Sequence, residues 1–275
     1  MTGEFEIPSE IIQHYEEDYD EAARLFSGGW GQVELLRTQE LIRRFIPEPP
    51  ATIIDVGGGP GVYAAWLTDL GYDVQLVDPG ERHSEQAGER SADIAVAKVG
   101  DARSLDYPDD SFDMALLLGP LYHLIERDDR LRALEEARRV TKTGSPVVVA
   151  AINRFASAID NLHSGTIDDP EFRAIAERDI VDGVHLNTTE DPRYFTTAFF
   201  HRAEELEREF SDAGLTGVEL FAVEGIAWAA PDLDERIADP EKRKHLLDLL
   251  RRLEREETLF GATGHILGVG WATST

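Results

Sequence analysis

The stretch Asp55-Val56-Gly57-Gly58-Gly59-Pro60-Gly61 decides the fold expected for this 275-residue chain. The apolar segment Thr52–Val56 predicts a strand that ends at the glycines, and Gly61–Leu70 predicts the helix that follows them. Glycines at a strand-to-helix turn let the backbone approach a ligand closely, and the first helical turn offers free N–H groups. Taken alone, the cluster fits either a tight turn or a site for a nucleotide-like ligand.

Strand and helix patterns alternate around this stretch. Strands are expected at Thr52–Val56, Asp73–Val77, Ile94–Val99, Phe112–Leu118 and Pro146–Ile152, with helices at Gly61–Leu70, at Arg82–Arg90 and after a cap at Asp128 or Asp129. Such alternation predicts βαβ units and a mostly parallel sheet. The strands are nearly continuous apolar runs, which predicts that helices cover both faces of the sheet.

The two ends of the chain have different patterns. Two helices are expected before the sheet, one over 8–27 and one from about Val33 to Phe45, with a glycine-rich break at Ser27–Gly31 between them. The alternation stops after Asn153. Later elements are expected at Glu204–Ala213 (helix), Gly217–Val223 (strand), Glu241–Glu257 (a helix capped by Asp239) and His265–Trp271 (strand).

Polar residues of a ligand-binding type follow several of the expected strands. Asp78 ends the second strand, where an acidic residue can accept hydrogen bonds from ribose hydroxyls. Asp101, after the third strand, is placed to accept from an adenine amino group. Leu118 and Gly119 end the fourth strand. Because ligands bind at the carboxyl edge of open α/β sheets, these residues are expected to meet at one site.

At this point the residues resemble those of the class I S-adenosylmethionine-dependent methyltransferases, and most closely the small-molecule enzymes of the ubiquinone-biosynthesis-like branch. Asp55–Gly61 matches the acidic-x-Gly-x-Gly-x-Gly motif of that family, and Asp78, Gly100–Ala102 and Asp110–Asp113 fall where its later motifs lie. The resemblance covers about Ala51–Ile152. The alternative is a nicotinamide-dependent dehydrogenase, but the Gly-x-Gly-x-x-Gly spacing of that class does not fit.

The resemblance implies S-adenosylmethionine as cofactor and S-adenosylhomocysteine as product. No His/Asp/Glu spacing in the sequence predicts a metal site, so we expect no metal. The glycine backbone would line the methionine part, Asp55 would orient its ammonium group, Asp78 would hold the ribose, Asp101 would frame the adenine, and Leu118 would close the site. The cofactor-binding set is therefore Asp55, Gly57, Gly58, Gly59, Gly61, Asp78, Pro79, Asp101, Ala102, Leu118, Gly119, Arg37 and Tyr19. Tyr19 would belong to a cover over the cofactor, or to core packing. Arg37 would pair with the cofactor carboxylate, or lie on a helix surface.

Three residues are candidates for acting on the acceptor. Methyl transfer is an in-line displacement, so a general base is needed only where the acceptor must lose a proton. His123 is the best base candidate, because it lies just after the fourth strand, although a structural role in the loop remains an alternative. Tyr122 would face the substrate or pack in the core. His201 follows the aromatic run Tyr194–Phe200, which would form either an apolar pocket wall or a buried strand.

Composition restricts the partners. The chain has 54 acidic and 27 basic residues, a formal net charge of −27, and such a surface repels nucleic acid. The absence of cysteine excludes disulfides, thiolate metal sites and a cysteine nucleophile. No apolar run is long enough for a membrane helix, and the acidic N-terminus has no signal pattern. We expect a cytoplasmic monomer or homodimer with no nucleic-acid or membrane partner.

Together these patterns predict one seven-stranded Rossmann-like methyltransferase domain over 1–275. Residues 1–50 would form an N-terminal helical cover, 51–152 the cofactor-binding core, and 153–200 and 225–262 insertions that serve as lid or substrate-binding elements. The expected activity is methyl transfer to O, N or C of a small molecule. A non-catalytic module that binds S-adenosylmethionine and a protein methyltransferase remain the alternatives.

Overall fold

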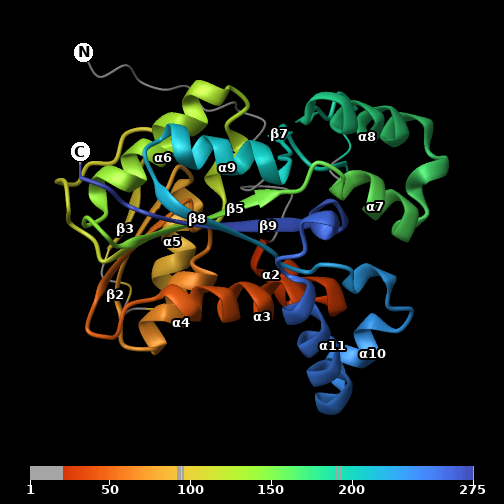
Figure 1. Ribbon diagram of the computed structural model, residues 1–275, viewed down its shortest axis with the longest axis horizontal. Coiled ribbons are helices and arrows are strands. Elements are labelled where there is room, and N and C mark those ends of the chain that lie inside the picture. Colours follow the sequence, from red (N-terminus) through yellow and green to blue (C-terminus); the bar gives the residue numbers. More distant parts are fainter. Residues whose placement is uncertain (1–20, 92–93, 95, 190, 192–193, 275) are drawn as a thin grey trace.

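The computed structural model describes residues 21–91, 94, 96–189, 191 and 194–274. Seven strands form one sheet in the order β3-β2-β1-β4-β5-β9-β8 (Figure 1). In that order they span Val96–Val99, Asp73–Asp78, Thr52–Val56, Met114–Leu117, Pro146–Ile152, His265–Trp271 and Thr216–Ala222. Only β9 runs against its neighbours, so the sheet is mostly parallel. The predicted fold class is confirmed.

Helices cover both faces of this sheet, as the apolar strands predict. One face carries α3 (Gly28–Phe45), α4 (Val62–Asp69) and α5 (Glu81–Arg90), and the other carries α6 (Arg127–Val140) and α9 (Ala203–Asp212) (Figure 1). Successive residues of a strand point to opposite faces. Ile53 therefore packs in the core beneath α3 and α4, whereas Ile54 packs in the core beneath α6 and α9. Both side chains are fully buried.

The break expected at Ser27–Gly31 is present but is limited to Ser27, because α3 already begins at Gly28. The helix expected over 8–27 lies mostly outside the described residues, and α2 (Glu21–Phe26) is its described part. A Cβ on Gly31 would lie 2.2 Å from the Arg24 carbonyl oxygen, and one on Gly29 would lie 2.8 Å from Leu233. Gly29 and Gly31 therefore let α3 approach α2 and α10 (Leu233–Ala238) closely, and they do not interrupt α3.

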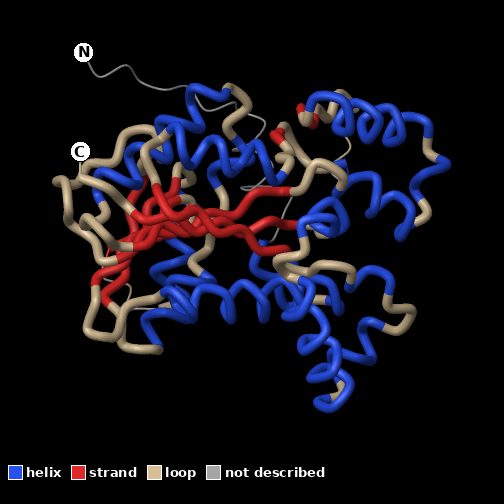
Figure 2. Tube along the Cα trace, viewed as in Figure 1, coloured by secondary structure: helices blue, strands red, loops and turns tan. Residues whose placement is uncertain are grey.

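The long segment after β5 is mainly helical. It contains α7 (Ala156–Ser164), the 3₁₀ turn η3 (Thr166–Asp168), α8 (Pro170–Asp182) and a two-stranded sheet of β6 (Val184–His185) and β7 (Ala198–Phe199). Figure 2 shows this helical part beyond one end of the main sheet. Because α7 follows β5 directly, the segment lies at the carboxyl edge of the sheet.

The second insertion contains η5 (Ala227–Ala229), α10 (Leu233–Ala238), α11 (Pro240–Leu253) and η6 (Glu257–Ala262). Asp239 caps α11 as expected, accepting from the backbone N–H of Glu241 at 2.9 Å and of Lys242 at 3.0 Å. The helix ends at Leu253, before the expected Glu257. Among the described residues, no helix combines the length and the apolarity needed to cross a membrane.

Candidate active site

A cavity of about 420 Å³, here called the first cavity, opens at the carboxyl ends of β1, β2, β3 and β4. The loops after these four strands bring together the polar residues that the sequence places at strand ends. Twelve of the predicted site residues line it: Asp55, Gly57, Gly58, Gly59, Asp78, Pro79, Asp101, Ala102, Leu118, Gly119, Tyr122 and His123. Parallel strands end at the same edge of a sheet, which explains why residues 55 to 123 converge here.

The glycines shape the wall between the β1 and β4 loops. Gly57 has φ +66°, and its N–H donates to the carbonyl of Val77 at 2.6 Å. A Cβ on Gly57 would lie 2.6 Å from Cδ of Pro120, and one on Gly119 would lie 2.8 Å from the Gly57 carbonyl oxygen. The two loops are therefore in backbone contact, which only residues without a side chain allow.

Gly61 does not line the first cavity, contrary to expectation. It precedes α4 with φ +76°, and a Cβ there would lie 2.9 Å from Cβ of Ala87 in α5. Its place in the motif is explained by the close packing of α4 on α5.

Asp55 is the most unusual residue of the first cavity. Its side chain is buried, and neither carboxylate oxygen has a hydrogen-bond partner among the described residues. Burial raises the pKa of Asp55 to about 7, and the nearby negative charge of Asp78 adds to this effect. A buried carboxylate without a partner is costly, so the site favours a ligand with a cationic or hydrogen-bond-donating group at this point.

Asp78 joins the first two loops of the sheet. Its Oδ2 accepts from the backbone N–H of Gly59 at 2.9 Å, and its Oδ1 accepts from that of Gly80, also at 2.9 Å. Nδ1 of His83 lies 3.0 Å from the same Oδ1. His83 lines the first cavity, although the motifs at the strand ends do not predict it as a site residue. Its position in the first turn of the helix after β2 was the available signal.

Asp101 is paired within the protein. Its Oδ1 accepts from the backbone N–H of Arg103 at 2.7 Å, and its Oδ2 accepts from the Arg103 guanidinium at 2.7 Å. The same guanidinium donates to Asp129 in α6 at 2.8 Å. Both Arg103 and Asp129 line the first cavity. The sequence motifs do not predict either as a site residue, because the two partners are 26 positions apart in the chain.

Tyr122 and His123 lie in the 3₁₀ turn η2 (Pro120–His123) that follows β4. Their rings make an edge contact with centroids 4.7 Å apart, and His123 Nδ1 lies 3.4 Å from the carbonyl oxygen of Thr197. His123 lines the first cavity only. Tyr122 also lines a second cavity, of about 300 Å³.

The second cavity lies beyond the ends of β5 and β9. Its aromatic wall consists of Trp30, Tyr122, Phe172, Tyr194, Phe195, Phe200 and Trp228, and its polar residues are Arg24, Ser157, Asp160, His163, His185 and His265. Three members of the predicted aromatic run therefore line it. Phe195 has φ +63°, a strained backbone conformation for a bulky residue, and its ring lies 6.0 Å from the rings of both His123 and His185.

His201, expected near the acceptor, lies in neither cavity. It is fully buried, and its Nε2 lies 3.1 Å from Glu209 in α9. Burial lowers the pKa of His201 despite this carboxylate. The physical reason is strand alternation, because Phe200 faces the second cavity and its neighbours Phe199 and His201 face the opposite side. The candidate catalytic role of His201 is therefore corrected to a structural one.

Arg37 also lies away from the first cavity. It is fully buried and forms ion pairs with Glu254 and, at 2.8 Å, with Glu40, while its Nε donates to the carbonyl of Val223 at 3.3 Å. Neither expected role holds, because the arginine is neither a partner of the cofactor carboxylate nor a surface residue. Tyr19, the remaining residue of the predicted cofactor-binding set, lies outside the described residues.

Residues 54–149 match a family of proteins described as "Methyltransferase domain". This match covers the strands and loops that build the first cavity. The chain carries a class I S-adenosylmethionine-dependent methyltransferase domain. The match ends before the segments that supply most of the second cavity.

Curated relatives agree with this methyltransferase assignment. The chain is 30% identical to methyltransferase GfsG of Streptomyces halstedii over 138 residues, which cover 48% of this chain and 45% of that protein. It is 26% identical to the ubiquinone/menaquinone biosynthesis C-methyltransferase UbiE of Ralstonia pickettii, over 74% of this chain and 82% of that protein. The chain spans less than half the length of the first curated relatives that it matches.

Solved structures share the methyltransferase fold. A methyltransferase of Thermotoga maritima, described as a possible histamine N-methyltransferase, has a TM-score of 0.58 and 19% identity, with 96% of this chain and 100% of that chain covered. The putative methyltransferase of Haloferax volcanii, solved with its activator Trm112, has a TM-score of 0.55 and 20% identity, with 90% and 93% covered. At these identities the likeness shows the fold alone.

The residues of the methyltransferase domain fit S-adenosylmethionine. This cofactor carries a sulfonium and an ammonium against one carboxylate, and the first cavity presents the unpartnered carboxylate of Asp55. The glycines beside Asp55 have no side chains, so the cofactor can approach the backbone closely there.

Proposed function

We propose that this chain transfers a methyl group from S-adenosylmethionine in the first cavity to a small molecule in the second cavity. The observation that carries the proposal is the shared wall, because Tyr122 lines both cavities. The two cavities therefore adjoin at Tyr122, and the proposal places the methyl group and the acceptor atom in direct contact at this junction, as in-line displacement requires.

In this proposal Asp55 binds the ammonium group of the cofactor, Asp78 binds the ribose, and Asp101 with Ala102 frames the adenine. Asp78 already accepts two backbone N–H groups, so it holds the ribose with its remaining lone pairs. Leu118 and Gly119 lie beside the methyl donor. The cofactor supplies an electrophilic methyl group when bound.

The reaction would need an O, N or C atom of the acceptor in line with the methyl carbon and the sulfur that leaves it. The protein holds the partners in line and excludes water. We assign the insertions 153–200 and 225–262 to acceptor binding, because Phe172, Phe200 and Trp228 line the second cavity. Where the acceptor must lose a proton, His123 is the proposed base, and Tyr122 positions the acceptor.

The names of the relatives support a small acceptor. UbiE acts in ubiquinone and menaquinone biosynthesis by its description, and these quinones are small molecules. A small-molecule acceptor also fits the size of the second cavity, since ligand sites for compounds of this kind begin near 300 Å³.

Transfer can be tested with S-adenosylmethionine labelled in its methyl group. The protein is incubated with this cofactor and a cell extract of the source organism, separated into small-molecule and protein fractions. We expect label to enter the small-molecule fraction. Label in protein alone would identify a protein methyltransferase, and no label despite cofactor binding would identify a non-catalytic module.

Asp78→Ala is expected to weaken S-adenosylhomocysteine binding by about tenfold or more, because the variant loses hydrogen bonds to the ribose and the link between the two loops. Calorimetric titration measures the affinity, and the thermal unfolding of each protein shows whether it is folded. A folded variant with unchanged affinity would contradict the role assigned to Asp78.

A further inference from the structure

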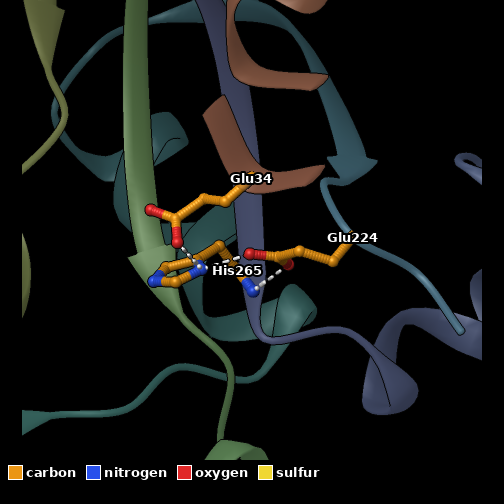
Figure 3. A group of neighbouring side chains, drawn as sticks. All are labelled: Glu34, Glu224 and His265. Atoms are coloured by element: carbon orange, nitrogen blue, oxygen red, sulfur yellow. Dashed lines mark hydrogen bonds and ion pairs between the residues drawn. The ribbon is translucent and has the colours of Figure 1, made fainter. Parts of the chain in front are cut away.

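The second cavity has a charged end at His265, the first residue of β9. Nδ1 of His265 lies 2.6 Å from Oε1 of Glu224 and 3.8 Å from Oε2 of Glu34, and the His265 backbone N–H donates to Glu224 at 2.8 Å (Figure 3). Nε2, on the other side of the ring, has no hydrogen-bond partner within the described parts of the chain. The side chain is 20% exposed and lines the cavity, so Nε2 is available to a ligand.

The glutamates hold a proton on this imidazole. Burial lowers the pKa of His265, but the charges of Glu34 and Glu224 outweigh burial and raise it to about 9. Glu34 is also paired with Arg24, and its own pKa is lowered to about 2 by His265 and Arg24 despite burial. At neutral pH His265 is therefore an imidazolium whose Nδ1–H donates to Glu224, and its Nε2–H is a second donor that can serve a ligand.

The two cations of this cluster line the second cavity, and the two carboxylates lie behind them. Arg24 and His265 line the second cavity, whereas Glu34 and Glu224 are buried and do not line it. The other titratable residues that line the cavity are Asp160 and His163, both exposed on α7, His185, which contacts Asp179 and the carbonyl of Tyr194, and the tyrosines Tyr122 and Tyr194. A ligand at the His265 end thus meets positive hydrogen-bond donors.

We infer that the methyl acceptor is a planar aromatic compound with an anionic oxygen, and that this oxygen accepts the Nε2–H of His265. The inference rests on the proposed function. The aromatic part would lie among Trp30, Phe195 and Trp228, where rings can stack or meet edge to face. Carboxylates and phenolates have the required oxygen, because they accept charge-assisted hydrogen bonds.

The sheet order sets the orientation of this acceptor. Tyr122 follows β4, and His265 begins β9, which is two strands farther along the sheet. Strands lie about 4.8 Å apart, so the two ends of the cavity are roughly 10 Å apart. The anionic oxygen at His265 is therefore remote from the methyl donor beyond Tyr122. The methylated atom is a different atom of the acceptor.

Two other ligands are less compatible with this end of the cavity. Aromatic rings attract organic cations, but Arg24 and His265 repel an ammonium group. A ligand atom from each of Glu34, Glu224 and His265 lies within 4.8 Å of the others, the spacing of a possible metal site. A divalent ion there would have to displace the Nδ1 proton and compete with Arg24 for Glu34. Without a metal, the four side chains already form two ion pairs, Arg24 with Glu34 and His265 with Glu224.

The test compares three probes of one shape: 2-naphthoate, neutral 2-naphthamide and protonated 2-naphthylmethylamine. Each is titrated at pH 7 into protein saturated with S-adenosylhomocysteine, with a chelator present. We expect 2-naphthoate to bind at least tenfold more tightly than the amide, and the amine to bind most weakly. His265→Gln, which keeps a donor but loses the charge, should reduce the preference for naphthoate to less than threefold.

His245→Gln is the matched control, because His245 is exposed on α11 and lines neither cavity. Its preference for naphthoate should equal that of the unchanged protein. If His265→Gln does not fold, the unchanged protein gives the second measurement. Its preference for naphthoate should decline as the pH rises through 9, where His265, facing Glu34, Glu224 and Arg24, loses its proton.

Equal binding of the three probes, preference for the amine, no binding of any probe, or a preference that survives in folded His265→Gln would overturn the inference. A requirement for added Mn²⁺ would overturn it as well, in favour of a metal at Glu34 and Glu224. Binding of S-adenosylhomocysteine is measured in the same samples. Its failure would contradict the proposed function itself, so the two failures are distinguishable.

Discussion

Replacement of Asp55 with Asn is expected to weaken S-adenosylhomocysteine binding by at least about 30-fold at pH 8. The variant leaves the ammonium group of the ligand buried without its countercharge, and truncating one partner of a buried charge pair costs about 2 kcal/mol or more. Asn has nearly the same shape as Asp, so the first cavity keeps its form. Calorimetric titration of both proteins measures the difference.

The pH dependence of binding gives this prediction a second, independent readout. The pKa of Asp55 is raised to about 7 in the free protein, and a bound ammonium group favours the ionised carboxylate. Affinity should therefore increase as the pH rises from about 5.5 and should level off above about 8. In Asp55→Asn this increase should disappear. The control is Asp73→Asn. Asp73 is exposed and begins β2, at the end of the strand away from the first cavity, so this variant should show the affinity and the pH dependence of the unchanged protein.

Asp55→Asn is expected to affect stability in the opposite direction from binding: it should weaken ligand binding but stabilise the ligand-free protein. A carboxyl group whose pKa is raised from 3.8 to about 7 on folding costs stability as the pH rises through that range. Asp55→Asn should therefore unfold at a higher temperature than the unchanged protein at pH 8 without ligand. A variant that loses both affinity and stability would show that Asp55 supports the fold and would contradict its assignment to the cofactor.

Arg130→Ala is expected to lower the free energy of unfolding by about 3 kcal/mol or more. Arg130 in α6 and Glu209 in α9 are both buried, with the guanidinium 2.8 Å from the carboxylate. The same guanidinium donates to the carbonyl oxygens of Leu124 and Ile125 at 2.9 and 2.6 Å. Removing one member of a buried pair leaves the other charge without compensation, which costs about 3–5 kcal/mol.

Denaturant unfolding measures this loss, and Lys244→Ala provides the control. Lys244 in α11 is exposed and pairs with the exposed Asp248 at 2.8 Å, so its replacement should cost less than about 1 kcal/mol. Equal losses in the two variants would show that burial does not decide the value of these pairs. A large loss for Arg130 alone would also support the structural role of His201, which contacts the same Glu209.

The core of the fold and the first cavity were predictable because their signals are local. Each ligand-type residue directly follows an apolar strand, and parallel strands bring those ends together without further information. Asp55, Asp78 and Asp101 line one cavity for this reason. Gly61 was misplaced because the same motif position serves helix packing against Ala87, and a helix contact is not visible in the motif.

The second cavity could be predicted only in part, because its walls come from segments far apart in the sequence. The aromatic run Tyr194–Phe200 gave a correct signal for one wall. Which histidine lines the second cavity depends on strand direction and on alternation, so the sequence pattern favours His201 and does not single out His265. Arg37 was misassigned because its partner, Glu254, lies 217 residues away and follows no strand.

The antiparallel last strand has an evolutionary consequence. Because β9 runs against its neighbours, its first residue lies at the ligand edge, and His265 reaches the second cavity from the far end of the chain. Among the described residues, every one that lines the first cavity precedes residue 130, whereas most of the second cavity comes from residues 152–265. Under the proposed function, sequence changes after residue 150 would alter the acceptor site without replacing any of these residues of the first cavity.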